Sequence, residues 1–321
     1  GGNHNLVITG NSISNVNMGI VVVGPTAAAD MNNVCTIGGS VANANTITNF
    51  GTTGTISSYA NVSGTVNGIL VRNTNNFTIS YNTIESSNGG TTSGTLNGIQ
   101  IPAFSATPTG TFTNNINYNN ISLRSAAATG AINGINYPSG SATTTSSLNI
   151  NNNNFYTFGH TVAASGTITF ILNASTHLNQ SISNNTFTNI TVNTTGSVTF
   201  ISNSNTLPAG GVKNINNNSI VTGFNKTGAG GTVTVHTDGS SSPAGTTVNN
   251  NNNNFSNITV TGATTITGWS NQDGGAPTKT IQNNTFNNWT GGTSAITVMT
   301  IGYSAANSII NGNTITNITG Q

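Results

Sequence analysis

Gly10-Asn11-Ser12-Ile13-Ser14-Asn15-Val16, near the start of the chain, has a close counterpart near its end, Gly312-Asn313-Thr314-Ile315-Thr316-Asn317-Ile318. Both contain an asparagine followed two residues later by an apolar side chain, Ile or Phe. This motif occurs ten times, at intervals of 29 to 37 residues and about 34 on average, with its anchor at Asn11, Asn45, Asn82, Asn119, Asn153, Asn185, Asn218, Asn253, Asn284 and Asn313. Self-similarity with a period of this length is typical of solenoids and other repeat architectures.

A second motif keeps the same phase as the first and is seen in Thr65-Val66-Asn67-Gly68-Ile69 and Thr95-Leu96-Asn97-Gly98-Ile99. Apolar and polar residues alternate within each copy, which is the period of a strand. Thr, Ile and Val abound, and Gly-Ser-Thr-Asn runs separate the copies. The sequence therefore predicts an all-β fold: a right-handed parallel β-helix of about ten coils of roughly 34 residues. We expect residues 1–321 to form one continuous solenoid without evident caps.

Stacking of the coils assigns a role to each position of the anchor motif. Its apolar residue should form a core column: Ile13, Ile47, Ile84, Ile121, Phe155, Phe187, Ile220, Phe255, Phe286 and Ile315. The anchor asparagine should occupy a tight turn, because Asn tolerates positive φ better than any residue except Gly. Its side-chain amide should hydrogen-bond to the same residue of the next coil. The ten anchors would then form a continuous ladder that satisfies otherwise buried polar groups.

With its Asn-Thr-Ile-Thr-Asn-Ile type turns, the chain resembles the right-handed parallel β-helix repeat proteins over nearly its whole length. That class includes pectate-lyase-like enzymes, phage tailspikes and large bacterial surface proteins. In its Asn, Thr, Ser and Gly bias the chain is most similar to repeat regions of very large secreted bacterial surface proteins. The resemblance implies the architecture and an extracellular or cell-surface location. It implies little about activity, because one solenoid can host many functions.

The composition narrows the possible partners. Only 3% of the 321 residues are charged, against about 25% in a typical domain, and the net charge is +1. Neither nucleic acid nor an anionic membrane surface is an expected partner. No apolar run is long enough to span a membrane. The single cysteine, Cys35, excludes an intrachain disulfide. Histidine, cysteine and acidic residues show no metal-ligand spacing, so we expect neither a metal nor another cofactor.

Few side chains could support chemistry on this scaffold. Asp238 and Asp273 are the only plausible acid pair, because each follows the second-motif strand in successive repeats. Each also precedes a glycine, and Asp-Gly favours a simple turn. Trp269 could be an exposed platform for a sugar ring or a core residue. Trp289 fills a position taken by Phe50, Phe158 and Ile190 in other repeats, which indicates a core residue. We therefore expect no enzyme, and treat Asp238, Asp273 and Trp269 as weak ligand candidates.

The expected function is structural: a segment of an adhesive extracellular filament or cell-surface stalk. The chain would associate with itself, end to end or laterally, and could contact surface glycans. Since no capping segment flanks the repeats, we expect a piece of a longer solenoid or a filament subunit. One alternative is a carbohydrate-binding or carbohydrate-active protein similar to tailspikes or lyases. Another is ice binding, which needs an outward Thr-x-Thr in every coil; Thr46-Ile47-Thr48 complies, whereas Asn120-Ile121-Ser122 does not.

Overall fold

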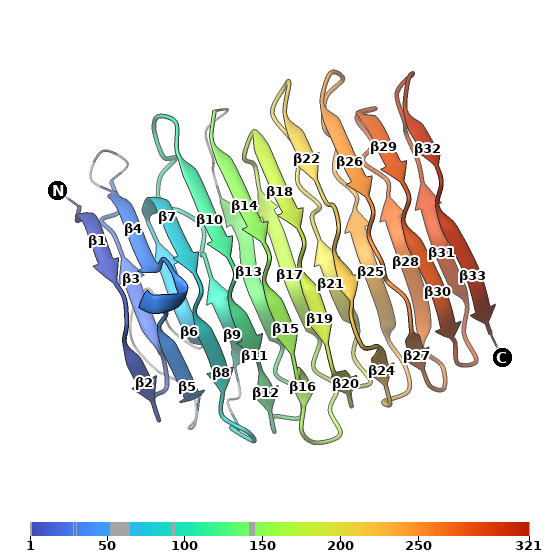
Figure 1. The fold of residues 1–321 in the computed structure, drawn as a ribbon, viewed down its shortest axis with the longest axis horizontal. Helices are drawn as coiled ribbons and strands as arrows, with labels where there is room; N and C mark the ends of the chain where they lie inside the picture. The colour runs from blue at the N-terminus through green and yellow to red at the C-terminus, as the bar shows by residue number, and fades with distance from the viewer. Residues whose placement is uncertain are drawn as a thin grey trace.

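The described residues wind into a parallel β-solenoid with almost no helix (Figure 1). This computed structural model describes residues 2–27, 29, 31–51, 65–91, 94–140 and 145–320, and only the backbone of 139 and 140. The all-β solenoid predicted from the repeats is confirmed. It has about eight turns, slightly fewer than the ten coils predicted. The ten-stranded sheet has one strand ahead of each anchor asparagine, whereas the other sheets have nine, seven, five and two strands.

Two long sheets face each other across the core. The longer has ten strands: β1 (His4–Ile8), β4 (Asn32–Gly38), β7 (Thr74–Ser80), β10 (Thr113–Asn117), β14 (Ser147–Asn151), β18 (Asn179–Ser183), β22 (Val212–Asn214), β26 (Thr247–Asn251), β29 (Thr278–Gln282) and β32 (Ile309–Asn311). The other has nine: β3 (Ile20–Val23), β6 (Thr65–Arg72), β9 (Thr95–Gln100), β13 (Ile132–Gly140), β17 (Ile168–Ser175), β21 (Val198–Ser202), β25 (Thr232–Asp238), β28 (Thr265–Asn271) and β31 (Ile296–Ile301).

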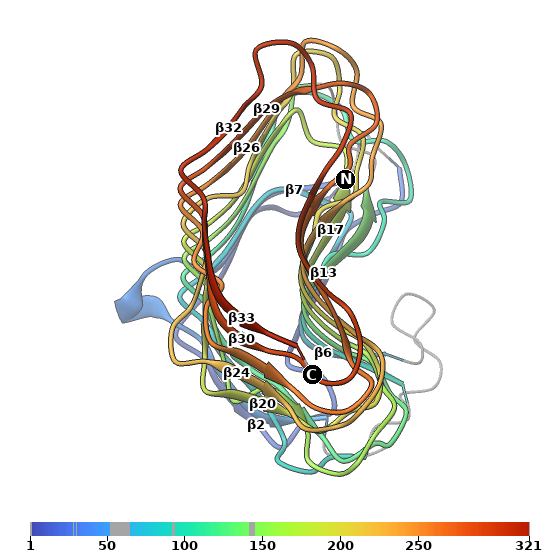
Figure 2. The same ribbon diagram turned by 90° about the vertical axis from the view of Figure 1, so that its right-hand side faces the viewer.

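Shorter sheets close one end of the cross-section. A seven-stranded sheet contains β2 (Ser12–Ser14), β5 (Thr46–Phe50), β8 (Thr83–Ser86), β11 (Asn120–Ser122), β15 (Asn154–Tyr156), β19 (Thr186–Thr188) and β23 (Ser219–Ile220). A five-stranded sheet contains β20 (Ile190–Val192), β24 (Phe224–Lys226), β27 (Ile258–Val260), β30 (Thr285–Thr290) and β33 (Thr314–Thr319). A two-stranded sheet pairs β12 (Arg124–Ser125) with β16 (Gly159–His160), and a short 3-10 helix, η2 (Val41–Asn43), projects sideways (Figure 2).

The apolar residues of the anchor motif form one column through the core. Each strand pairs in parallel with the equivalent strand one coil away, so that Ile121 lies opposite both Ile84 and Phe155. All members from Ile47 to Phe286 are buried, at 0–3% exposed. The first member, Ile13, is half-buried, and the last, Ile315, is 47% exposed because β33 has a neighbouring coil on one side only.

In nine of the ten repeats the residue before the anchor asparagine has positive φ, Ala44 being the exception, which corrects the prediction that the anchor itself adopts positive φ. Asn152, Asn184 and Asn217 each have a φ of 58° and directly precede the anchors Asn153, Asn185 and Asn218. Tyr81 and Tyr118 occupy the same position, with φ of 62° and 59°, and their rings stack. The turn and the ladder are therefore formed by different, adjacent residues.

The cross-section is narrow in its middle, where the nine-stranded sheet curves inward toward the opposite wall (Figure 2). The glycines of the second motif permit this approach. A Cβ added at Gly98 would lie 2.8 Å from Cγ2 of Ile121 and 2.7 Å from the carbonyl oxygen of Gly134. Later coils place Phe170 and Phe200 at this position, and both are fully buried. Two wider regions remain on either side of the narrow middle (Figure 2).

Candidate functional site

The ten anchor asparagines form an unbroken side-chain ladder. In each pair, Nδ2 of one asparagine donates to Oδ1 of the next along the chain, at 2.8–3.1 Å, from Asn11 to Asn313. The same Oδ1 also accepts the backbone N–H of the preceding anchor, at 2.9–3.4 Å. The asparagines are therefore aligned in a single row parallel to the solenoid axis.

Asn153, in the middle of the row, shows how fully each amide is satisfied. Its Nδ2 donates to Oδ1 of Asn185 at 3.1 Å and to the carbonyl oxygen of Ile116 at 2.8 Å. Its Oδ1 accepts both the backbone N–H and Nδ2 of Asn119, each at 3.0 Å. Its side chain is fully buried. Both donor hydrogens and both acceptor lone pairs are used, so burial leaves no polar atom of this amide without a partner.

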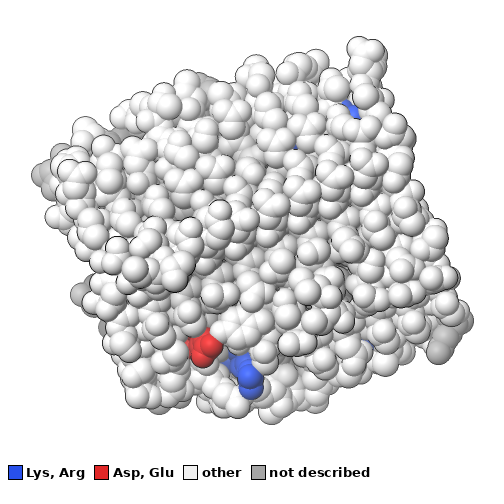
Figure 3. Space-filling view, in the orientation of Figure 1, with Lys and Arg blue, Asp and Glu red and all other residues white. Residues whose placement is uncertain are grey.

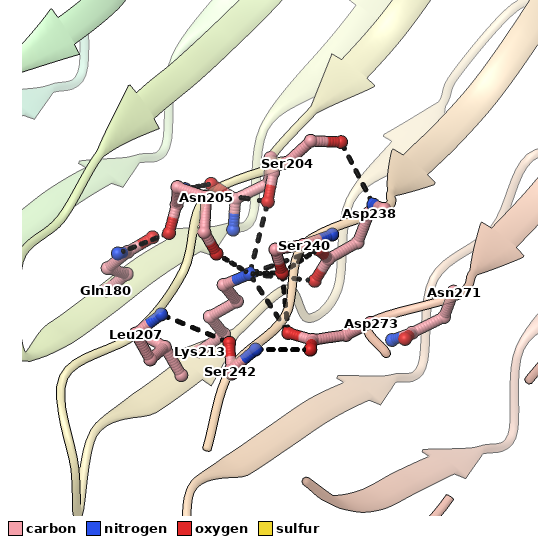
Figure 4. Close-up of polar contacts among 12 residues, drawn as sticks. Gln180, Ser204, Asn205, Leu207, Lys213, Asp238, Ser240, Ser242, Asn271 and Asp273 are labelled. Atoms are coloured by element: carbon pink, nitrogen blue, oxygen red, sulfur yellow. Dashed lines mark hydrogen bonds and ion pairs between the residues drawn. The ribbon is translucent and has the colours of Figure 1, made fainter. Parts of the chain in front are cut away.

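The two acids singled out by the sequence also lie close together, around a lysine that the sequence analysis did not connect with them. Nζ of Lys213 lies 3.1 and 3.0 Å from Oδ1 and Oδ2 of Asp238, and 3.6 Å from Oδ2 of Asp273 (Figure 4). The Ser240 hydroxyl lies 2.8 Å from Oδ1 of Asp238, 2.6 Å from Oδ2 of Asp273 and 3.0 Å from Lys213 Nζ. We refer to Lys213, Asp238, Ser240 and Asp273 as the ionic cluster.

Strand register directs the ionic cluster into the core. Lys213 belongs to an inward-facing row of the ten-stranded sheet whose other members include Leu148, Gln180, Val248 and Lys279. Asp238 is the last residue of β25, and Asp273 lies two residues beyond the end of β28. The cluster is therefore in the wider region where the chain passes from the nine-stranded to the ten-stranded sheet. Sequence reasoning missed Lys213, although its alignment with Leu148 and Val248 signals an inward position.

The environment shifts the pKa values of the two carboxyl groups in opposite directions. Burial raises the pKa of Asp238 above its usual range, although Lys213 and Ser240 oppose the effect. Burial acts in the same direction on Asp273, but hydrogen bonds from Ser240 and Ser242, together with the charge of Lys213, outweigh it. The pKa of Asp273 therefore lies below its usual range. Asp273 retains its negative charge more readily, whereas Asp238 accepts a proton more readily.

None of the three weak ligand candidates is open to solvent. Asp238 is 1% exposed, and Asp273 and Trp269 are 0% exposed. Asp238 ends strand β25 and Asp273 directly precedes a turn at 274–275, and both side chains are buried. The Trp269 indole stacks on His236 and donates to Oδ1 of Asn250 at 3.1 Å, so it is a core residue. A sugar polymer cannot contact these groups in this fold.

Surface hollows occur on another side of the molecule. One of about 520 Å³ lies over β20, β24 and β27, and one of about 210 Å³ lies beside it over β12 and β16. They share Asn189 and Thr191, and their rims are amides and hydroxyls, with Arg124 at one end. We refer to them together as the lateral groove. Figure 3 shows that the molecular surface, seen in the orientation of Figure 1, is almost free of charged side chains.

The described residues do not form a metal site or a membrane-spanning helix. They contain no group of three or more His, Cys, Asp or Glu side chains arranged to hold a metal ion. In the same part of the chain, no helix is both long and apolar enough to cross a membrane. Comparisons with protein-family models, curated proteins and solved structures find no match.

Proposed function

We propose that the chain is a structural rod, a segment of an adhesive extracellular filament or cell-surface stalk. The observation that carries this proposal is the ladder of ten asparagines, which continues without a gap through the described coils. A ladder and a core column of this kind extend simply by adding coils, because each added coil contributes its own contacts with its neighbour. An extracellular location is supported by the similarity in composition to repeat regions of secreted bacterial surface proteins.

The distribution of charge also supports a passive role. Lys213, Asp238 and Asp273 are buried and paired with one another, so they are not available to a substrate. Acid–base chemistry on a polysaccharide requires two carboxyl groups that can reach the sugar. A lyase or hydrolase activity centred on these acids is therefore disfavoured.

Electron microscopy of the full-length protein from its native source tests the proposal. We expect filaments or stalks with an axial coil spacing of about 4.8 Å. Ile310→Asp, at a side chain of β32 that is 45% exposed, should shorten them if the rods join through this end. Val41→Asp is the matched control, because Val41 is 78% exposed on the laterally projecting η2. Dispersed monomers under all conditions, with no lateral or end-to-end assembly, would exclude the proposal.

The lateral groove favours glycan binding as a second candidate function. Its outward rim residues, Asn189, Thr191, Asn225 and Thr259, offer amides and hydroxyls to a neutral sugar chain. A glycan array tests this function. Binding should be lost in a Thr191→Trp variant, which fills the shared part of the groove, and kept in Thr267→Trp on the nine-stranded sheet. Equal binding by both variants would place the ligand elsewhere.

The strand register provides one observation that favours ice binding. Thr169, Thr199, Thr234, Thr267 and Thr297 lie opposite one another in five successive turns of the nine-stranded sheet. Rows of hydroxyls about 4.8 Å apart can order water. The sheet curves inward in cross-section (Figure 2), which limits contact with a flat ice plane, so we rank this function last. Thermal hysteresis that is lost in Thr234→Tyr would reverse that ranking.

A further inference from the structure

We propose that Lys213 and Asp238 condense spontaneously into a side-chain amide, a covalent cross-link between the ten-stranded sheet and the end of β25. This inference is independent of whether the chain forms a fibre. It rests on three features of the ionic cluster: the distance between the reacting groups, a second carboxyl group placed to move protons, and the exclusion of water.

The reacting atoms are already in contact. Nζ lies 3.1 and 3.0 Å from the two carboxyl oxygens of Asp238, so it faces the carboxyl carbon almost symmetrically. For a carboxyl group of standard dimensions, this places Nζ no more than about 3.4 Å from Cγ, which is within the range of a near-attack arrangement. Groups that are held at this distance and are also aligned for attack react with effective concentrations of roughly 10⁵–10⁸ M.

Asp273 and Ser240 provide a path for the protons. Oδ2 of Asp273 lies 3.6 Å from Lys213 Nζ, and the Ser240 hydroxyl bridges this oxygen to Oδ1 of Asp238. Nζ loses one proton to become a nucleophile and a second as the amide forms; Asp273 accepts them and, through Ser240, passes them to the departing Oδ1. The lone pair of Nζ forms the bond to Cγ, and Oδ1 leaves with its bonding pair as water.

The reaction needs no atoms or electrons from outside the site. An ammonium group and a carboxylate become one neutral amide and one water molecule, with no oxidant or other reactant, and Asp273 ends as the carboxylate with which it began. The opposite shifts of the two carboxyl groups suit these roles, because a protonated acid is attacked more readily than a carboxylate and an ionised one is the better base. Lys213, Asp238 and Asp273 are fully buried, so the condensation removes two charges from a medium that penalises them. The water molecule that it releases must leave the site, and burial then limits access of solvent water that would reverse the step.

Mass spectrometry of the folded wild-type chain tests the proposal. We expect the intact mass to be lower by one water molecule. Dehydration alone is not sufficient evidence, because Asp238-Gly239 and Asp273-Gly274 could each lose water through a backbone succinimide. Trypsin distinguishes the two events: an acylated Lys213 is not cleaved, and it joins the peptide containing residues 125–226 to the peptide containing 227–279. Tandem spectra should identify this branched product.

Two variants complete the experiment. Lys213→Arg keeps the charge and the tryptic site but removes the nucleophile, so the branched peptide should vanish. Asp273→Asn keeps the reacting pair and removes the base, so the cross-link should form at least about 100-fold more slowly. Folding of each variant is checked by circular dichroism. Normal cleavage after Lys213 in folded wild-type protein, with or without loss of water, would overturn the proposal.

Discussion

Removing one amide from the middle of the asparagine ladder should cost far more stability than removing an asparagine on the surface. Asn153→Ala deletes four hydrogen bonds, two donated and two accepted, in a site with no access to solvent. At about 1 kcal/mol for each bond, the expected loss in the free energy of unfolding is about 4 kcal/mol. The backbone N–H of Asn119 and the carbonyl oxygen of Ile116 would lose partners that water cannot replace in this site.

Asn149→Ala is the matched control. Asn149 belongs to β14, four residues before Asn153, and its half-buried side chain donates to Oδ1 of Asn115 at 2.9 Å on the outer face. Water can replace that bond, so we expect a loss of no more than about 1 kcal/mol. Urea unfolding followed by circular dichroism gives both values, provided that the dependence on urea is the same in the two variants. Native-state hydrogen exchange should place the weakening in the neighbouring coils. Equal losses in the two variants would refute the ladder as a source of stability.

Three further perturbations follow from the packing and the buried charges. Gly98→Ala should destabilise the fold by about 1–3 kcal/mol in the same assay, because a methyl group meets Gly134 and Ile121, whereas Gly239→Ala, in open space, should not. Relative to wild-type chains in which Lys213 and Asp238 are still an ion pair, Lys213→Met should cost about 3–5 kcal/mol because two buried carboxyl groups lose the ammonium that they share, a loss that adding Asp238→Asn should partly reverse. Burial lowers the pKa of His177 and of His236 to about 3. The contribution of each neutral histidine to the free energy of unfolding is therefore fully present above pH 6.5. It should fall by about 1.4 kcal/mol per pH unit for each histidine as the pH drops toward 3. His236→Phe should remove one histidine's share of that slope, and an unchanged slope would contradict the assignment.

The fold could be predicted because its main interactions repeat in the sequence. The ten anchor asparagines and the apolar residues that follow them recur in phase, and each coil places them against the same residues of its neighbours. The position of the turn was wrong by one residue, because both Asn152 and Asn153 are asparagines and composition cannot tell which one adopts positive φ. The number of turns was also slightly too high, because the prediction counted one coil for each copy of the motif.

The ionic cluster could be predicted only in part. Asp238 and Asp273 share a phase in successive repeats, which was enough to pair them. Their burial depends on which way two strand ends turn inside one wide region of the core. Lys213 comes from the opposite sheet, so its partnership with these acids is a property of the closed coil and has no counterpart in local sequence. The same holds for Trp269, whose burial depends on His236 one coil away and Asn250 on the facing wall.

The asparagine ladder also gives the rod a direction. All nine of its amide-to-amide hydrogen bonds run the same way, from the earlier coil to the later one, so the amide dipoles add along the axis and the two end faces are chemically different. Two rods can continue the row across a junction only if both have the same orientation. A twofold-symmetric junction, which would bring identical end faces together, would reverse the sense of donation and break the row. Any assembly through such end faces would therefore be vectorial, with one face offering amide donors and the opposite face offering amide acceptors.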